Sequence, residues 1–196
     1  MPEKTVQKEP GKKPAPSKKP KPQQEVVVQV PLSELHPFPD HPFQVREDAS
    51  MQETAESVKE YGVLVPALAR PREDGGYELI AGHRRKHACE LAGLATMPVI
   101  VRDIDRDAAT IIMVDSNLQR ENILPSERAK AYKMKMEAIK RQGARTDLTS
   151  PKISAKFRSD DEVGQDAGVS GDTIRNYIAL TQLVPELQQM VDEKKI

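Results

Sequence analysis

The chain has 196 residues, a formal net charge of zero, 37% hydrophobic and 31% charged residues, and no Trp. This length suits one substantial domain or two small ones. An aromatic content of 4% argues against a stacking platform for single-stranded nucleic acid. The single cysteine, Cys89, excludes an intrachain disulfide and is typical of a reducing compartment. Without a membrane-length apolar run or a secretory signal, the sequence predicts a soluble, cytoplasmic protein.

Residues 1–25 differ in composition from the rest of the chain, with seven Lys against three Glu. The segment is also rich in Pro and Gln and has few apolar side chains, which predicts a disordered tail. The tail has two interpretations. It is either a solubilising extension or a basic arm that binds a partner protein or nucleic-acid phosphates.

An α+β pattern follows the tail, because strands alternate with helices before the chain becomes wholly helical. Residues 26–30 are β-branched and predict the first strand. A proline-rich loop comes next. Ser50 and Glu53 then form a capping-box pattern at the start of a helix that we expect to end at Gly62.

The most informative stretch combines two predicted strands, a turn and the start of a helix. Residues 63–69 predict a strand, 73–76 a hairpin turn, and 77–80 a second strand. Gly82 interrupts this pattern, and a helix begins at His83. A strand, a glycine turn and a helix that starts with two arginines can present cations and backbone N–H groups to an anion.

Further along, residues 97–101 predict a strand, and Asp105 can cap the helix that follows it. A longer helix is expected to begin at Pro125 or Ser126 and to end at Gly143. Its predicted outer face is basic. The basic residues assigned to that face are Arg128, Lys130, Lys133, Lys135, Lys140 and Arg141.

Residues 144–158 are polar and irregular and predict a linker to a small helical unit. In this unit 161–167 predict one helix, 168–170 a tight turn, and 171–180 a second helix capped by Ser170. Small and apolar residues fall where a helix-turn-helix needs them, although an ordinary helical hairpin is the alternative. The outward residues that could read base edges are Ser170, Thr173, Arg175 and Asn176.

Phosphate contacts are not expected from the helical unit itself, because residues 151–196 hold six basic and eight acidic side chains. We expect them instead from the tail and from the long basic helix. The candidate residues on that helix are Lys133, Lys140 and Arg141.

The residues alone leave the chemistry of the glycine–arginine stretch open. GHRR (82–85) fits a phosphate site, but two arginines at a helix start could equally form a solvated face. His83 and His87 lie four residues apart, as a metal pair on one helix face would. The sequence has no carboxylate or cysteine spaced to complete such a site.

A second candidate cluster lies at residues 115–122, where an amide, a cation and carboxylates follow an apolar helix. Asn117 could hold Mg²⁺ there, and Arg120 could hold a phosphate. A plain polar helix end is the alternative interpretation.

Taken together, four stretches and the helical unit after them resemble the ParB family in order and spacing. The stretches are HPFQVRED (41–48), GVLVPALARP (62–71), YELIAGHRRKHACELAG (77–93) and SNLQRENILPSERAKAY (116–132). The resemblance covers residues 26 to about 190. This family binds centromere-like DNA sites in chromosome and plasmid partition and includes related nucleoid-occlusion proteins.

The resemblance implies a ParB/sulfiredoxin-like nucleotide-binding domain at 26–122 and an all-α DNA-binding domain at 123–196. The helix-turn-helix would lie at about 160–180 in the second domain. The first domain would bind CTP with Mg²⁺, and Asn117 would be the metal ligand. The implied nucleotide-binding residues are Gly62, Gly82, His83, Arg84, Arg85, His87, Ala88, Asn117 and Arg120.

Three positions depart from the family pattern. His83 stands where the GERR motif has Glu, and Ser116 where the ENLQR motif has Glu. Because those acids position water and metal for hydrolysis, we expect binding to persist and turnover to be weak unless Asp115 or Glu121 substitutes. Val65 replaces the usual Gln near the base, which weakens the expectation of cytosine selectivity.

The family resemblance also implies partners. The protein would be a nucleoid-associated homodimer that closes on partition-site DNA as a clamp and meets a ParA-type ATPase through residues 1–25. No membrane partner is expected. The given sequence ends at Ile196, just beyond the predicted helix-turn-helix, so we expect either that the family's C-terminal dimerisation domain has been removed from it or that the protein dimerises in another way.

Two other functions are weighed against this one. The first is a transcriptional regulator that binds DNA and whose nucleotide site is degenerate. The second is a sulfiredoxin-like or kinase-like nucleotide-dependent enzyme. A sulfiredoxin needs a reactive cysteine beside the glycine–arginine loop, whereas Cys89 is predicted to lie inside the helix as a core residue.

Overall fold

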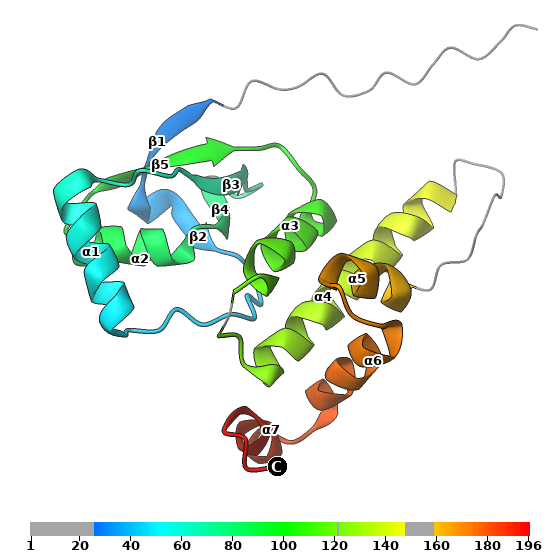
Figure 1. Ribbon diagram of the computed structural model, residues 1–196. Helices are drawn as coiled ribbons and strands as arrows, with labels where there is room; N and C mark the ends of the chain where they lie inside the picture. Colours follow the sequence, from blue (N-terminus) through cyan, green and yellow to red (C-terminus); the bar gives the residue numbers. More distant parts are fainter. Residues whose placement is uncertain (1–25, 121, 148–158) are drawn as a thin grey trace, which may run out of the picture.

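The computed structural model describes residues 26–120, 122–147 and 159–196 (Figure 1). The predicted tail at 1–25, the catalytic candidate Glu121, and the part of the predicted linker at 148–158 lie outside the described residues. A five-stranded mixed sheet with helices between its strands comes first and only helices follow β5, which confirms the α+β class. Among the described helices, none is both long enough and apolar enough to cross a membrane.

The sheet combines antiparallel and parallel pairs. In spatial order its strands are β1 (Val27–Pro31), β5 (Thr96–Val101), β3 (Ala67–Pro71), β4 (Tyr77–Ala81) and β2 (Leu35–Pro37). β1 pairs with β5 and β3 with β4 in antiparallel fashion, whereas β3 with β5 and β2 with β4 are parallel. The predicted hairpin therefore forms, and Arg70 and Glu78 face each other across it with an Nε–Oε2 distance of 2.5 Å.

The two faces of the sheet carry different layers of helices. The helical segments are η1 (Leu32–Glu34), α1 (Ala49–Tyr61), α2 (His83–Leu91), α3 (Arg106–Leu118), α4 (Pro125–Asp147), α5 (Ser159–Ala167), α6 (Gly171–Ala179), η2 (Leu180–Gln182) and α7 (Pro185–Asp192). Successive residues of β4 point to opposite faces. Leu79 packs with Met51 of α1 and Cys89 of α2, whereas Ile80 packs with Met113 of α3 and Ala131 of α4. Full burial of a Leu, Ile or Met side chain contributes about 1.5–3 kcal/mol.

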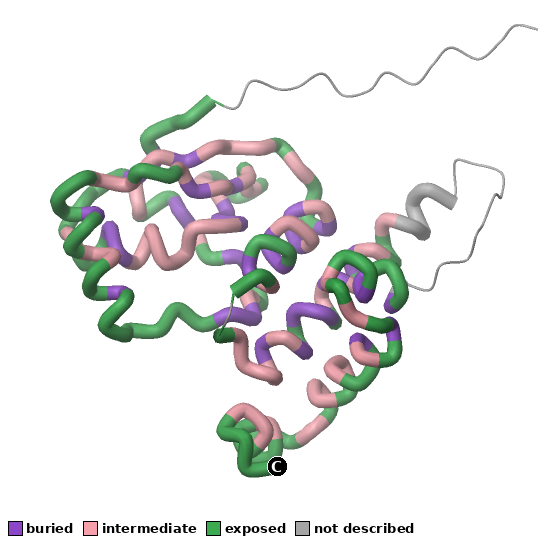
Figure 2. The backbone as a smooth tube through the Cα atoms, in the orientation of Figure 1, coloured by how far each residue is buried: buried purple, intermediate pink, exposed green. Residues whose placement is uncertain are grey.

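Helix α4 joins the sheet layer to the small helical unit, as Figure 1 shows. One side of α4 packs on α3, and another side packs on α5 and α6 through Tyr132, Val163 and Ile174. Figure 2 shows buried positions along the half of α4 that lies between these neighbours. Gly164 allows the turn after α5 to approach closely, because a Cβ at this position would lie 2.6 Å from the carbonyl oxygen of Val169.

The start of the first helix differs from the prediction. Asp48, not Ser50, is the N-cap of α1, and its Oδ1 accepts a hydrogen bond from the backbone N of Met51 at 2.8 Å. An Asp in extended conformation before a helix is as good a cap as Ser. Asp105 and Ser170 cap α3 and α6 as predicted.

Three further expectations about these elements were wrong. Residues 63–66 form a loop instead of the start of β3. α4 continues past Gly143 to Asp147, because a glycine inside a helix costs only about 1 kcal/mol and does not by itself end it. Lys135 is buried, with a side chain that is 1% exposed, and does not belong to the basic outer face.

Candidate functional site

The corner between β4 and α2 lies at the centre of the candidate site. Gly82 has φ 110° and ψ 20°, which is left-handed, and a Cβ at this position would lie 2.8 Å from the Cβ of Ala67. Any other residue would be both strained and crowded there. No described side chain caps α2, so the backbone N–H groups of its first turn are available to an anion.

A cavity of about 450 Å³ lies beside the first turn of α2, and we call it the arginine cavity. The arginine cavity is lined by Phe43, Gln44, Arg46, Asp48, Ser50, Thr54, Arg84, Arg120, Asn122, Ile123 and Glu127. Three guanidinium groups face two carboxylates in this set, so cations are in excess. Guanidinium groups form paired, charge-assisted hydrogen bonds with phosphate oxygens, which makes the cavity suited to a phosphate ligand.

Arg84 is held at the point where α1 and α2 begin. Its Nη2 donates to Ser50 Oγ at 3.2 Å and lies 3.8 Å from Asp48 Oδ1. Asp48 and Ser50 belong to the cap and first turn of α1. The N-termini of two helices therefore meet at the arginine cavity, and each adds partial positive charge to that of the guanidinium groups.

Arg85, the neighbouring predicted phosphate ligand, has a different position. It does not line the arginine cavity, and its Nη1 donates to the carbonyl oxygens of Val65 and Pro66, both at 2.6 Å. Burial lowers the pKa of the Arg85 guanidinium. These bonds fasten the loop after α1 to the start of α2 and explain why residues 63–66 do not pair as a strand.

Three other predicted nucleotide-binding residues also lie outside the cavity lining. Gly62 ends α1 with φ 71°, and Ala88 is buried in the core between the sheet and α2. The His87 ring lies 3.4 Å from a carboxylate oxygen of Glu47 and 3.4 Å from one of Glu90. In this arrangement Gly62, His87 and Ala88 stabilise the elements around the arginine cavity and do not line it.

His83 pairs with a second histidine, His41, and their ring centroids lie 4.0 Å apart. Burial, with smaller contributions from His41, Arg120 and Lys86, lowers the pKa of His83 from 6.5 to about 3. Burial also lowers the pKa of His41. Neither Nε2 atom has a hydrogen-bond partner among the described residues. At neutral pH, position 83, where the family resemblance implies a Glu, therefore holds an uncharged imidazole.

Two predicted ligands lie at the end of α3, and only one of them lines the arginine cavity. Arg120 lines the cavity, and burial lowers the pKa of its guanidinium. Asn117 is 3% exposed, and its Nδ2 donates to the carbonyl oxygen of Met113 at 2.8 Å. The cavity thus fits phosphate oxygens, whereas Asn117 is not among the residues that line it, and its role as a Mg²⁺ ligand stays a prediction. In the described part of the chain, no three His, Cys, Asp or Glu side chains are grouped to hold a metal.

The catalytic candidate Asp115 lies away from the arginine cavity. Its Oδ1 accepts from Lys135 Nζ at 2.6 Å, and the same ammonium donates to Asp166 Oδ2 at 2.8 Å. Asp115 and Asp166 line a different cavity, of about 540 Å³, between α3, α4 and α5. Lys135 therefore joins three helices, and the position of Asp115 does not support its predicted role in turnover.

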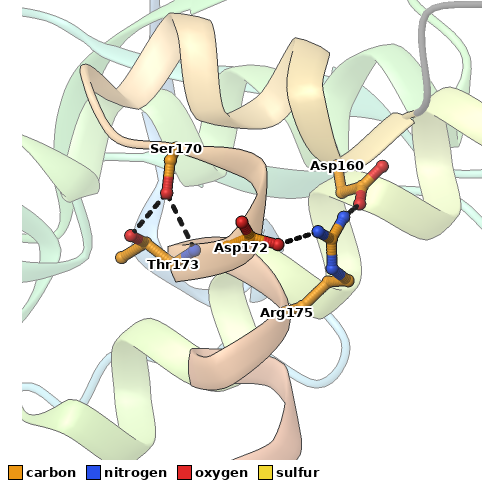
Figure 3. A network of polar contacts seen from close by, with 5 residues as sticks. All are labelled: Asp160, Ser170, Asp172, Thr173 and Arg175. Atoms are coloured by element: carbon orange, nitrogen blue, oxygen red, sulfur yellow. Dashed lines mark hydrogen bonds and ion pairs between the residues drawn. The ribbon is translucent and has the colours of Figure 1, made fainter.

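Figure 3 shows the polar network at the start of α6. Ser170 Oγ accepts from the backbone N of Thr173 at 3.2 Å and lies 2.9 Å from the hydroxyl oxygen Oγ1 of Thr173. The Arg175 guanidinium donates to Asp160 of α5 and to Asp172 of α6. Three of the four residues predicted to read bases are thus engaged: Ser170 caps the helix, the Thr173 hydroxyl is hydrogen-bonded to Ser170, and Arg175 ties α5 to α6.

The other side chains predicted to contact DNA differ in their exposure and in their partners. Lys133 and Lys140 are exposed on α4, and Asn176 is exposed on α6. Arg141 Nε donates to Asp107 Oδ1 at 2.7 Å. The α5–α6 segment has one arginine against five acids, which are Asp160, Asp161, Glu162, Asp166 and Asp172.

Sequence reasoning assigned only Arg84 and Arg120 of the lining to the site, and three of the residues that it missed carry polar groups important to the cavity. Gln44 and Arg46 lie in the HPFQVRED stretch, which was matched to the family without any residue being assigned to the site. Glu127 follows Pro125 in the first turn of α4 and is 7% exposed. An Arg placed just before a helix N-terminus was the available signal for Arg46. Nothing in the local sequence shows that Glu127 is buried.

Cys89 bears on the enzyme alternative. It is fully buried in the core between the sheet and α2, and burial raises the pKa of its thiol. A reactive cysteine requires a lowered pKa and access to substrate. Cys89 therefore has neither property of the nucleophile that a sulfiredoxin-like activity needs.

Comparisons with known proteins gave the following similarities. Residues 16–118 match the family model of the ParB N-terminal domain. The chromosome-partitioning protein Spo0J of Thermus thermophilus is 36% identical over 171 residues, which are 87% of this chain and 56% of that protein. A probable chromosome-partitioning protein ParB of Helicobacter pylori is 39% identical over 170 residues, 87% of this chain and 52% of that protein.

Among solved structures, one similar chain is a C-terminally truncated chromosome-partitioning protein ParB of Caulobacter crescentus, complexed to the centromeric parS site. It has a TM-score of 0.56 and 27% identity, and the match covers 86% of this chain and 79% of that chain. The chain spans about half the length of the curated relatives it matches.

Proposed function

The chain belongs to the ParB family, and from this premise we propose that it is a CTP-gated, sequence-specific DNA-binding protein of chromosome or plasmid partition. The observation that carries the nucleotide part is the arginine cavity. Its three guanidinium groups and two converging helix N-termini together offer the hydrogen-bond donors that a triphosphate requires.

Each part of the site has a separate task in this proposal. Arg84 and Arg120 bind phosphate oxygens, and Arg46 closes the cavity from the loop before α1. Gly82 keeps the backbone of the α2 corner accessible, since a side chain there would meet Ala67. Arg85 orients the loop at 62–66, which the family resemblance places near the base.

The DNA part of the proposal rests on α5 and α6. The similar Caulobacter protein was solved in complex with its parS site. We assign Thr173 and Asn176 of α6 to base edges, with the start of the helix in the major groove. The exposed Lys133 and Lys140 of α4 supply phosphate contacts that the acidic α5–α6 segment does not.

Helix α4 provides the route between the two ligands. Its first turn lines the arginine cavity, and its later turns pack on α5 and α6. A nucleotide that shifts α4 therefore shifts the DNA-reading unit. On this proposal the chain acts as a homodimer that closes around partition-site DNA and engages a ParA-type ATPase through residues 1–25.

We propose that the site binds nucleotide well and hydrolyses it slowly. When bound, Mg²⁺ would supply charge neutralisation for the phosphates. The residues that would assist hydrolysis are weak here, since the His83 imidazole is neutral and Asp115 is held by Lys135. Nucleotide occupancy itself would then be the main signal.

Calorimetric titration with CTP, ATP and GTP in the presence of Mg²⁺ tests the nucleotide part. The proposal predicts saturable binding with a preference for CTP, and about tenfold or greater weakening in Arg84→Ala, because one charged hydrogen-bond donor is lost. Arg72→Ala is a matched control, since Arg72 pairs with Asp74 in the β3–β4 turn. Equal binding of the three nucleotides would refute the CTP switch, and equal loss in both variants would refute the assignment of Arg84.

A further inference from the structure

Glu127 is a buried carboxylate at the rim of a cavity rich in arginine. It lies in the first turn of α4 and is 7% exposed. Burial lowers the pKa values of Arg120 and His41, and the negative charge of Glu127 partly opposes this lowering for both groups. A buried negative charge beside a site for polyanions lowers the affinity of that site. The contacts that Glu127 makes should therefore show what the carboxylate does there.

The contacts of Glu127 connect two segments that are far apart in sequence. Its Oε1 accepts from the backbone N of Gln44 at 3.1 Å, and its Oε2 accepts from the backbone N of Leu124 at 3.2 Å. Leu124 immediately precedes α4, so the second bond is half of a capping box and stabilises the helix start. The first bond is not a capping bond, because it holds the loop that carries Arg46 against α4.

We propose that Glu127 is an electrostatic latch between the arginine cavity and α4. This inference rests on the proposed function, namely that the cavity takes a polyphosphate. With the carboxylate bonded to Gln44 and Leu124, the loop and α4 are held together. A polyphosphate in the cavity repels the carboxylate and competes with it for Arg120. The ligand therefore favours the state in which the Gln44 bond is broken and α4 is free to move.

The latch satisfies the thermodynamic condition for a ligand-driven change. A ligand shifts an equilibrium only to the extent that it binds one state better than the other. Here the difference comes from a single charge that lies near the phosphates when the latch is closed and farther away when it is open. Reciprocally, whatever opens the latch strengthens polyphosphate binding by the same factor.

Glu127→Gln separates the latch from a purely structural role. Glutamine keeps the size of the side chain and one acceptor oxygen but removes the charge and the second acceptor. We expect the variant to bind CTP and inorganic tripolyphosphate roughly three- to tenfold more tightly than the wild type, because one like charge has gone. Glu137→Gln is the control, since Glu137 is exposed on the same helix, and it should leave affinity unchanged.

Amide hydrogen exchange gives a second readout that a capping role alone would not move. In the wild type, tripolyphosphate should speed exchange at the backbone N–H group of Gln44 but not at that of Leu124, whose bond to Glu127 caps α4, and in Glu127→Gln it should have little effect on either. Binding without these changes, or weaker binding by the variant, would overturn the latch and leave the proposed function intact. Absence of any polyphosphate binding by the wild type would overturn both.

Discussion

Lys135 joins three helices through one buried ammonium group, and its removal tests how that junction is stabilised. Lys135→Met keeps the apolar stem but deletes the charge and both hydrogen bonds. The side chains of Asp115 and Asp166 are 47% and 55% exposed, so water can solvate them once the ammonium is gone. We therefore expect a modest loss of about 1–2 kcal/mol in the free energy of unfolding.

The opposite deletion should be worse. In a chain with both Asp115→Ala and Asp166→Ala, the ammonium, which is 1% exposed, loses both acceptors. Leaving a buried charge without a partner typically costs about 3–5 kcal/mol. Urea denaturation at pH 7 measures both values, and Lys133→Met, at an exposed position of the same helix, should stay within about 0.5 kcal/mol of the wild type. A larger loss for Lys135→Met than for the double variant would refute this reasoning.

The alkaline limb of the stability profile offers an independent check. Burial by itself lowers the pKa of Lys135, but hydrogen bonds and charge from Asp115 and Asp166 outweigh it and raise the pKa above 10.5. A raised pKa in the folded state stabilises the protein below the unfolded pKa, and this stabilisation is lost as the pH rises through the folded value. Lys135→Met should therefore lose less stability above about pH 10 than the wild type does.

Three other predictions concern the sites at either side of α4. The pKa of His83 is lowered from 6.5 in the unfolded chain to about 3 in the folded protein, so the neutral imidazole stabilises the fold above pH 6.5 and this stabilisation is lost as the pH falls. From pH 7 to 5.5 the free energy of unfolding should fall by about 1 kcal/mol. Urea denaturation should show a smaller fall in His83→Gln. Gly82→Ala should destabilise by about 1–3 kcal/mol in the same assay, because of the left-handed φ and the contact with Ala67; a change under about 0.5 kcal/mol would contradict this. Asn176→Ala should weaken binding to a duplex selected from random DNA by about 1–3 kcal/mol and leave binding to unrelated DNA unchanged; equal weakening of both in an electrophoretic shift assay would mean that Asn176 contacts only phosphates.

The sequence predicted the parts of the fold that depend on local signals. The glycine break before α2 required a left-handed residue, and Asp105 and Ser170 had the side chains of good caps. The choice of Ser50 over Asp48 failed because both can cap, and the sequence does not show that the Ser50 hydroxyl accepts from Arg84.

The expectations that failed depended on contacts between distant segments. Helical periodicity placed Lys135 on the outer face of α4, but α3 and α5 pack on that side and supply its two carboxylates. The loop at 63–66 has the composition of a strand, yet its carbonyl groups bond to Arg85. Periodicity describes one helix or strand and carries no information about which neighbour covers it.

The candidate site was predicted in outline and changed in detail. Arg84 and Arg120 come together in the arginine cavity, as their separate motifs suggested. Arg46 and Glu127 join them from matched stretches in which neither residue had been assigned to the site. Asn117 and Arg85 belong to the matched motifs, but neither lines the cavity. A motif identifies the segment that forms a site, whereas side-chain direction depends on tertiary packing.

The central claim is that the arginine cavity holds the triphosphate of CTP, and a crystal structure of the chain grown with CTP and Mg²⁺ tests it most directly. The account predicts phosphate density in the cavity, within hydrogen-bond distance of the guanidinium groups of Arg84 and Arg120. Density for the triphosphate at any other place, with Arg84 still bonded to Ser50 as it is here, would contradict it.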